Sequence, residues 1–163
     1  MSFLSKVQAA RKNPSGCKLS QKSIKWVFNY IGSFNTKSIR LPSDVETELR
    51  DFRIRKPTKL FRVLTSKSRG LLENNTYKTN TFTSWSKSKK FVENWGEIAA
   101  GRSGDSEYKI ISATFSPKDT IVDIDNLVDV VEGIESLESE VLVAPNTYQV
   151  EVSQVFLKRV SSY

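Results

Sequence analysis

The sequence predicts one α+β domain in which helices come first and mostly antiparallel strands follow. Apolar residues recur at helical spacing over residues 1–56, whereas residues that favour strands dominate over 57–163. Only one helical stretch, over residues 87–100, interrupts those strands. The regular alternation of strand and helix that builds a parallel sheet is missing. We therefore expect a single domain spanning residues 1–163, with a helical portion (1–56) and a β-rich core (57–163).

Three helices are predicted in the helical portion. A short one within residues 1–16 ends at Asn13-Pro14, because the residue before a proline avoids helical backbone. A second covers residues 19–34 and is capped by Ser20. A third opens with a capping box, Ser43 to Glu46, and runs to about Arg53. Their apolar stripes are, in chain order, Phe3, Leu4, Val7 and Ala10; Ile24, Val27, Phe28 and Ile31; and Val45, Leu49 and Phe52.

The β-rich core is predicted as short strands around one helix. That helix begins at Ser86 and ends at Gly101, because glycine suits the residue after a helix, and residues 102–107 follow as a polar loop. Residues 66–76 are predicted as loop, and 125–133 as one helical turn or an irregular loop. The predicted strands are 59–64, 77–85, 108–115, 120–124 and a final hairpin of 141–144 with 147–160, bulged near Gln154.

Composition narrows the classes of function. The formal charge is +7 and the pI about 9.5, which favours an acidic partner such as a dinucleotide, a nucleic acid or an acidic protein. There is no histidine, which argues against histidine general-base catalysis and most zinc sites, so no metal is expected. The single cysteine, Cys17, fits a reducing compartment. With neither a signal-peptide pattern nor a long apolar run, we expect a cytoplasmic monomer without a membrane partner.

Three polar groups stand out in the β-rich core. Arg62 interrupts the apolar run 60–64, and a guanidinium facing inward needs a polar or anionic partner. Residues 83–86, Thr-Ser-Trp-Ser, join an aromatic strand to a helix, where Ser86 is equally well interpreted as a helix cap. Glu138 and Glu140 open an apolar strand, and the period of a strand places both on one face. Taken alone, that pair is interpreted equally well as a solvated strand entrance.

In this order, the three groups resemble the Arg–Ser–Glu class of mono-ADP-ribosyltransferases, of the bacteriophage or bacterial toxin type. The family has a strand arginine, a Ser-Thr-Ser-like motif after an aromatic residue, and Glu-x-Glu before an apolar strand. The matching residues here are Arg62, Ser84, Glu138 and Glu140, within a stretch of about 58–160. Trp85 replaces the middle residue of the serine motif, and Val63 the glycine that often follows the arginine. The resemblance implies helices packed on a mostly antiparallel split β-sandwich.

The resemblance also implies NAD⁺ as co-substrate and an ADP-ribose transfer that releases nicotinamide. Arg62 would bind the NAD⁺ phosphates, Ser84 would hold Glu140, and Glu140 would bind the nicotinamide ribose. Glu138 would activate the acceptor, which its glutamate identity suggests is an arginine of a host protein in the host cytoplasm. Residues expected to contact NAD⁺ are Arg62, Ser84, Trp85, Ser86, Phe91 and Arg102, and those expected to recognise the acceptor are Glu135, Ser136 and Glu138.

Two other functions remain open from the sequence. The same site could transfer ADP-ribose to nucleic acid or to water, the latter as an NAD⁺ glycohydrolase. A different class, a basic module that binds nucleic acid, would use Arg62 and the lysine clusters for phosphates and Trp85, Trp95 and Tyr108 for stacking. Against that module, the lysines are scattered, and the carboxylates at 138 and 140 would repel a phosphate backbone.

Overall fold

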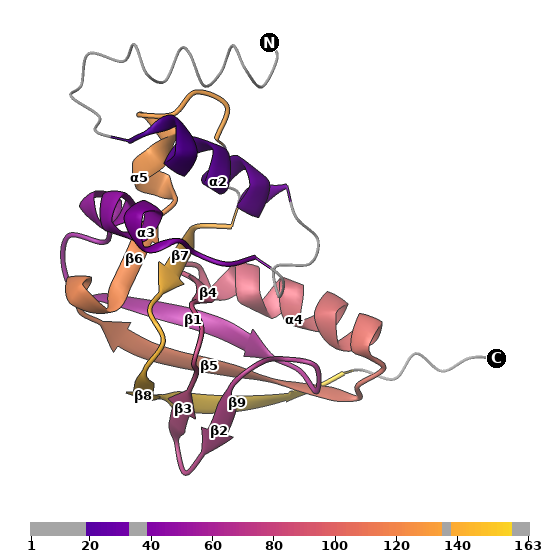
Figure 1. Cartoon of the computed structure of the whole chain (residues 1–163). Coiled ribbons are helices and arrows are strands. Elements are labelled where there is room, and N and C mark those ends of the chain that lie inside the picture. Colours follow the sequence, from indigo (N-terminus) through magenta and orange to yellow (C-terminus); the bar gives the residue numbers. More distant parts are fainter. Residues whose placement is uncertain (1–18, 33–38, 135–137, 158–163) are drawn as a thin grey trace.

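A computed structural model describes residues 19–32, 39–134 and 138–157. The predicted helix within residues 1–16 lies outside this part of the chain. The described helices and strands form an α+β fold with two antiparallel sheets (Figure 1). The helices are α2 (Gln21–Ile31), α3 (Ser43–Leu49), η2 (Arg50–Phe52), α4 (Lys89–Ser103), η3 (Pro117–Asp119) and α5 (Asp125–Val128).

The larger sheet has six strands in the order β6-β7-β4-β1-β5-β9, and the smaller has three in the order β2-β3-β8. All the strand pairings recorded in the described part of the chain are antiparallel, which confirms the predicted sheet type. The strands are β1 (Thr58–Leu64), β2 (Leu71–Glu73), β3 (Thr76–Lys78), β4 (Thr83–Ser86), β5 (Glu107–Phe115), β6 (Thr120–Asp123), β7 (Glu140–Val143), β8 (Thr147–Gln149) and β9 (Glu151–Phe156).

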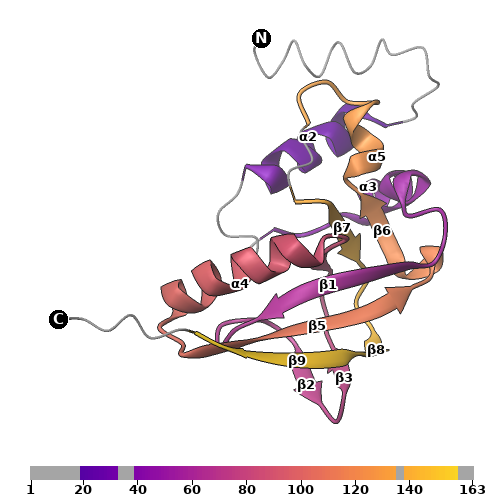
Figure 2. The same cartoon turned by 180° about the vertical axis from the view of Figure 1, so that it is seen from behind.

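The helices cover the larger sheet in two groups. α2, α3 and α5 gather at one end of the molecule, and α4 lies along β1 (Figures 1 and 2). The first group buries Ile24, Val27 and Leu49 against Ile121 and Val122 of β6. α4 contributes Val92 and Ala100 to a separate cluster with Tyr108 and Ile110 of β5. Burial of these apolar side chains supplies most of the driving force for folding.

Helix α2 is built as predicted at its start, and its predicted apolar stripe is buried at Ile24 and Val27 but not at its last residue. Ser20 is the N-cap and accepts a hydrogen bond from the Ser23 backbone N–H. Ile31, which the stripe places inward, is 44% exposed, while Trp26 and Tyr30 are buried. The buried face of α2 therefore also includes Trp26 and Tyr30, which are spaced four residues apart and are neighbours on a helix.

Several predicted boundaries are wrong. α3 has Pro42 as its N-cap without a side-chain hydrogen bond, so Ser43 forms no capping box. The predicted loop over residues 66–76 contains the strand β2. The single strand predicted over residues 77–85 is instead two short strands, β3 and β4. α4 is capped by Ser88 and ends at Gly104, which has a left-handed φ of 75°, so Gly101 lies within the helix.

The C-terminal hairpin is also wrong. β7 pairs with β4 and β6 in the larger sheet, β8 pairs with β3 in the smaller sheet, and β9 returns to the larger sheet beside β5. The β5–β9 register is continuous from Glu107↔Phe156 to Ser112↔Glu151, so there is no bulge near Gln154. The change of face that suggested a bulge is instead the transition between two sheets at Val150, which lies between β8 and β9.

Among the described residues, no helix is long and apolar enough to cross a membrane.

A carboxylate joins α2 to α3, and its replacement has a predictable effect on stability. Glu48 of α3 accepts hydrogen bonds from the Ser20 N–H (2.6 Å), the Ser20 hydroxyl (2.7 Å) and the Ser23 hydroxyl (2.6 Å). Burial alone would raise the pKa of Glu48, but the hydrogen bonds from Ser23 and Ser20 outweigh it and lower the pKa. The stabilisation is therefore present above the unfolded-state pKa and is lost as the pH falls through the folded-state value.

We expect Glu48→Gln to lower the free energy of unfolding at neutral pH by about 1–3 kcal/mol, because the charged acceptor is lost. The difference from the wild type should shrink as the pH is lowered, because the wild-type carboxylate is then protonated too. Urea unfolding at several pH values measures this, with Glu73→Gln, an exposed position on β2, as the control. A pH-independent difference would show that the ionised form has no special role.

Candidate active site

Three neighbouring strands of the larger sheet bring Arg62, Ser84 and Glu140 together. They lie on β1, β4 and β7, which are adjacent in the sheet. Arg62 donates from Nη1 to the backbone carbonyl of Ser84 at 2.7 Å. The Ser84 hydroxyl donates to Oε2 of Glu140 at 2.5 Å. A guanidinium, a hydroxyl and a carboxylate distant in sequence thus form one continuous hydrogen-bonded cluster.

The Arg62 guanidinium keeps most of its donors. Nε donates to the Tyr77 hydroxyl at 3.3 Å, and one N–H of Nη1 goes to Ser84. A guanidinium has five N–H donors. Within the described part of the chain, the remaining donors have no protein acceptor, and Arg62 forms no ion pair with a carboxylate. A half-buried cation of this kind can bind an anionic ligand such as a phosphate.

Tyr77 keeps this arginine in place. Its ring is 1% exposed and packs edge-on against Trp85, while its hydroxyl donates to the Arg69 carbonyl. Gly70 has a left-handed φ of 95°, and a Cβ there would lie 2.6 Å from the Tyr77 ring. Only glycine allows the chain to pass so close to Tyr77. The turn at residue 70 thus fixes the hydroxyl that accepts from Arg62.

The segment 138–140 is held by its backbone. The Ser86 hydroxyl donates to the Glu138 carbonyl at 2.6 Å, and the Lys87 N–H donates to the Ser139 carbonyl at 3.0 Å. Ser139 has a φ of 48°, so the strand begins only at Glu140. The strand-period argument for Glu138 and Glu140 is therefore wrong in its geometry. The strain of a left-handed serine is of a kind that clusters at functional sites.

The two carboxylates nevertheless influence each other. Partial desolvation and the negative charge of Glu140 raise the pKa of Glu138. Glu138 is exposed at the surface, whereas Glu140 is half-buried. A carboxylate with a raised pKa binds a proton more tightly than an ordinary surface carboxylate, which suits a general base working near neutral pH.

An ion cluster lies directly behind this segment. The Lys87 ammonium donates to both carboxylate oxygens of Asp123, at 3.0 and 2.9 Å, and to Asp125. Burial alone would lower the pKa of Lys87, but the hydrogen bonds to Asp125 and Asp123 raise it. Because Lys87 is bonded to both Ser139 and β6, it connects the turn before Glu140 to the neighbouring strand.

Helix α2 supplies a residue that the sequence did not single out. The Tyr30 hydroxyl donates to Oε2 of Glu140 at 2.6 Å, so this oxygen accepts from both Tyr30 and Ser84. Tyr30 is 5% exposed, is stacked on Trp26 at 5.4 Å and packs against Phe82. The i, i+4 aromatic pair Trp26–Tyr30 was the only sequence signal that could have pointed to it.

A cavity of about 330 Å³ opens beside the cluster. Arg62, Ser84 and Tyr30 line it, together with the aromatic side chains of Phe82 and Trp95. Glu140 is not among the lining residues and lies one hydrogen bond behind Tyr30 and Ser84. A ligand in this cavity would therefore meet a cation, two hydroxyls and aromatic surface.

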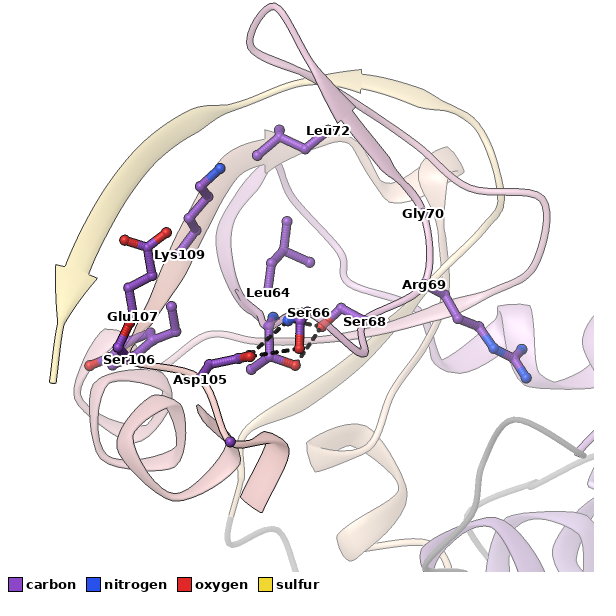
Figure 3. Close-up of a pocket in the computed structure, with 13 residues that line it drawn as sticks. Leu64, Ser66, Ser68, Arg69, Gly70, Leu72, Asp105, Ser106, Glu107 and Lys109 are labelled. Carbon is purple, nitrogen blue, oxygen red and sulfur yellow. Dashed lines mark hydrogen bonds between the residues drawn. The ribbon is translucent and has the colours of Figure 1, made fainter. Parts of the chain in front are cut away.

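Figure 3 shows a second cavity, of about 530 Å³. Both are lined by Thr65, Ser68 and Arg69. Leu64 and Leu72 give the second cavity apolar surface. Asp105 also lines it, and its carboxylate accepts from the Ser66 N–H at 2.9 Å and from the Ser66 hydroxyl at 2.7 Å. The two cavities are therefore neighbours, and each has a mixed polar and apolar lining.

Other residues expected to contact NAD⁺ lie elsewhere. Trp85 is 2% exposed and packs against Phe115 in the core, on the opposite face of β4 from Ser84, so its expected contact with NAD⁺ is wrong. Ser86 is buried and bonded to Glu138, which makes it a support for the 138–140 segment. Phe91 packs with the α4–β5 cluster.

The remaining expectations concern residues predicted to lie in two loops. Arg102 lies in α4 and not in a loop, because this helix extends to Ser103. Its guanidinium lies over the Trp95 ring, 5.6 Å from the ring centroid. Glu135 and Ser136 lie outside the described residues, so their expected role in acceptor recognition stays a prediction.

Two further findings bear on the site. No family model, curated protein or solved structure matches the chain. Over residues 19–32, 39–134 and 138–157, no group of three or more His, Cys, Asp or Glu side chains has a metal-binding arrangement.

Proposed function

We propose that this protein is an NAD⁺-dependent mono-ADP-ribosyltransferase that modifies arginine side chains of a cytoplasmic host protein. The observation that carries the proposal is the hydrogen-bonded cluster Arg62–Ser84–Glu140, in which Arg62 and Ser84 line a cavity and Glu140 lies one hydrogen bond behind Ser84. The six-stranded sheet beside a three-stranded one supports an ADP-ribosyltransferase-type split sandwich.

Arg62 would bind the diphosphate of NAD⁺. Its unused N–H donors match the geometry of phosphate oxygens, and it lines the cavity of about 330 Å³ together with Thr65 and Ser68, which line both cavities. The nicotinamide half would then occupy the cavity of about 330 Å³, beside Phe82, and the adenosine half the cavity of about 530 Å³. The planar nicotinamide ring would pack on aromatic surface.

Glu140 would stabilise the ribosyl cation. The bond between nicotinamide and C1′ of the ribose breaks with its electron pair leaving on nicotinamide, which gives an oxocarbenium-like transition state. Within the described part of the chain, Oε1 of Glu140 has no hydrogen-bond partner, so it could accept from a ribose hydroxyl that reaches past Tyr30 and Ser84 in the cavity wall. A carboxylate held in place before the charge develops stabilises that charge at little reorganisation cost.

Glu138 would activate the acceptor. A guanidinium is a poor nucleophile while protonated, so a nearby base must take a proton as the new C1′–N bond forms. The raised pKa of Glu138 makes it a better base than an ordinary surface carboxylate. The products are ADP-ribosyl-arginine and nicotinamide, with the proton held first by Glu138.

The proposal is tested by incubating the protein with adenylate-labelled NAD⁺ and an arginine-rich acceptor, while nicotinamide release is followed separately. Label on the acceptor together with nicotinamide supports transfer. Nicotinamide without label on the acceptor indicates hydrolysis, and label on added RNA or DNA indicates a nucleic-acid acceptor. No nicotinamide release with any acceptor overturns the proposal.

The Glu138→Gln variant separates transfer from hydrolysis. We expect transfer to arginine to fall by about a hundredfold or more, the usual contribution of a general base. Hydrolysis of NAD⁺ should change much less, because water needs less activation by this group. Wild-type transfer should also fall as the pH drops below the raised pKa of Glu138, and the variant should lack that dependence. Equal loss of both reactions would remove Glu138 from its role with the acceptor.

A further inference from the structure

Helix α2 reaches the candidate active site through one side chain. Tyr30 is 5% exposed, and its hydroxyl is 2.6 Å from Oε2 of Glu140. Ser84 donates to the same oxygen at 2.5 Å. We propose that Tyr30 is a positioning residue for Glu140, so that α2 is part of the catalytic apparatus rather than a cover over the sheet. This inference rests on the proposed function.

The geometry gives the phenol a specific task. Two donors on Oε2 restrict rotation of the Glu140 carboxylate and leave Oε1 as the oxygen available to a ribose hydroxyl. Ser84 alone would leave the carboxylate with one directional hydrogen bond. Positioning matters here because a small displacement of a catalytic group can lower a rate about a hundredfold.

The surroundings of Tyr30 keep it as a donor. Burial raises the pKa of Tyr30 well above its usual value, and the Glu140 carboxylate raises it further. Ser84 and Arg62 act in the opposite direction, but their effects are smaller. The phenol therefore stays protonated over the working pH range and can only donate to the ionised carboxylate.

The ring of Tyr30 is fixed independently of its hydroxyl. It stacks on Trp26 with ring planes 8° apart, and both rings contact Phe82, which lies just before β4. The Trp26 indole donates to the Arg40 carbonyl at 2.7 Å. Replacing Tyr30 by phenylalanine should therefore keep the packing and remove only the hydrogen bond.

The test is the Tyr30→Phe variant, assayed for NAD⁺ cleavage at saturating and limiting NAD⁺. We expect kcat to fall about tenfold, the equivalent of one lost hydrogen bond to a charged group, with KM for NAD⁺ nearly unchanged. Tyr148→Phe is the matched control, because it also removes a tyrosine hydrogen bond, to the Ala144 carbonyl at 2.7 Å, away from the cavity. That variant should lose stability without losing kcat.

A second measurement does not depend on activity. Tyr30→Phe and Glu140→Ala should be coupled in a double-mutant cycle of unfolding free energies, because each removes the same hydrogen bond between the two side chains. Additive effects, or an unchanged kcat in a folded Tyr30→Phe protein, would overturn this inference while leaving the proposed function intact. Absence of NAD⁺ cleavage by the wild type would instead overturn the proposed function, and this inference with it.

Discussion

Glu140→Gln is expected to lower both ADP-ribose transfer and NAD⁺ hydrolysis by at least about a hundredfold, the scale on which single charge-stabilising groups act. Both reactions share the bond cleavage that generates the ribosyl cation, so both need the negative charge at this position. The amide oxygen of glutamine can still accept from Ser84 and Tyr30, so the fold should be retained. The rate of nicotinamide release, with and without an acceptor, measures the effect.

Glu151→Gln is the control for this variant. Glu151 lies on the edge strand β9, with its side chain 83% exposed and 3.7 Å from Lys59. Removing its charge should leave both reactions within experimental error, since exposed ion pairs contribute little. If Glu140→Gln kept most of its NAD⁺ cleavage while remaining folded, the charge at this position would not be used in the reaction.

Much of the larger sheet could be predicted because its strands carry strong local patterns. Residues 59–64 and 108–115 are apolar runs that match β1 and β5 to within one residue at either end. The smaller sheet could not be predicted, because β2, β3 and β8 are each three residues long and are held by pairing across the chain. Strands of that length leave no recognisable period, and tertiary contacts decide them.

The candidate site was predictable only in part. Arg62 was noticeable because a guanidinium within an apolar strand needs a partner, and the structure supplies the Ser84 carbonyl and Tyr77. Tyr30 could not be predicted from the sequence, because its role depends on how α2 packs near Glu140 of β7, and no local sequence pattern encodes that packing. Trp85 was misplaced for a related reason: an aromatic residue between two polar ones is compatible with either a binding surface or the core, and burial decides.

Arg62→Lys is expected to raise KM for NAD⁺ by about tenfold or more, because an ammonium cannot form the paired hydrogen bonds that a planar guanidinium makes to a diphosphate. The charge is kept, so any loss reports on geometry rather than on attraction alone. We expect a smaller effect on kcat, since the phosphates lie away from the bond that breaks. Initial rates over a range of NAD⁺ concentrations separate the two parameters, and binding of NAD⁺ by calorimetry provides an independent value.

Stability should fall in the same variant. A lysine cannot bond the Ser84 carbonyl and the Tyr77 hydroxyl at the same time, so one partly buried acceptor loses its donor, at a cost of about 1 kcal/mol. Arg53→Lys, at an exposed position, is the control and should change neither quantity. If Arg62→Lys lost stability but kept its affinity for NAD⁺, Arg62 would be a structural residue that organises β1 and β4, and the anion site would have to be sought elsewhere in the two cavities.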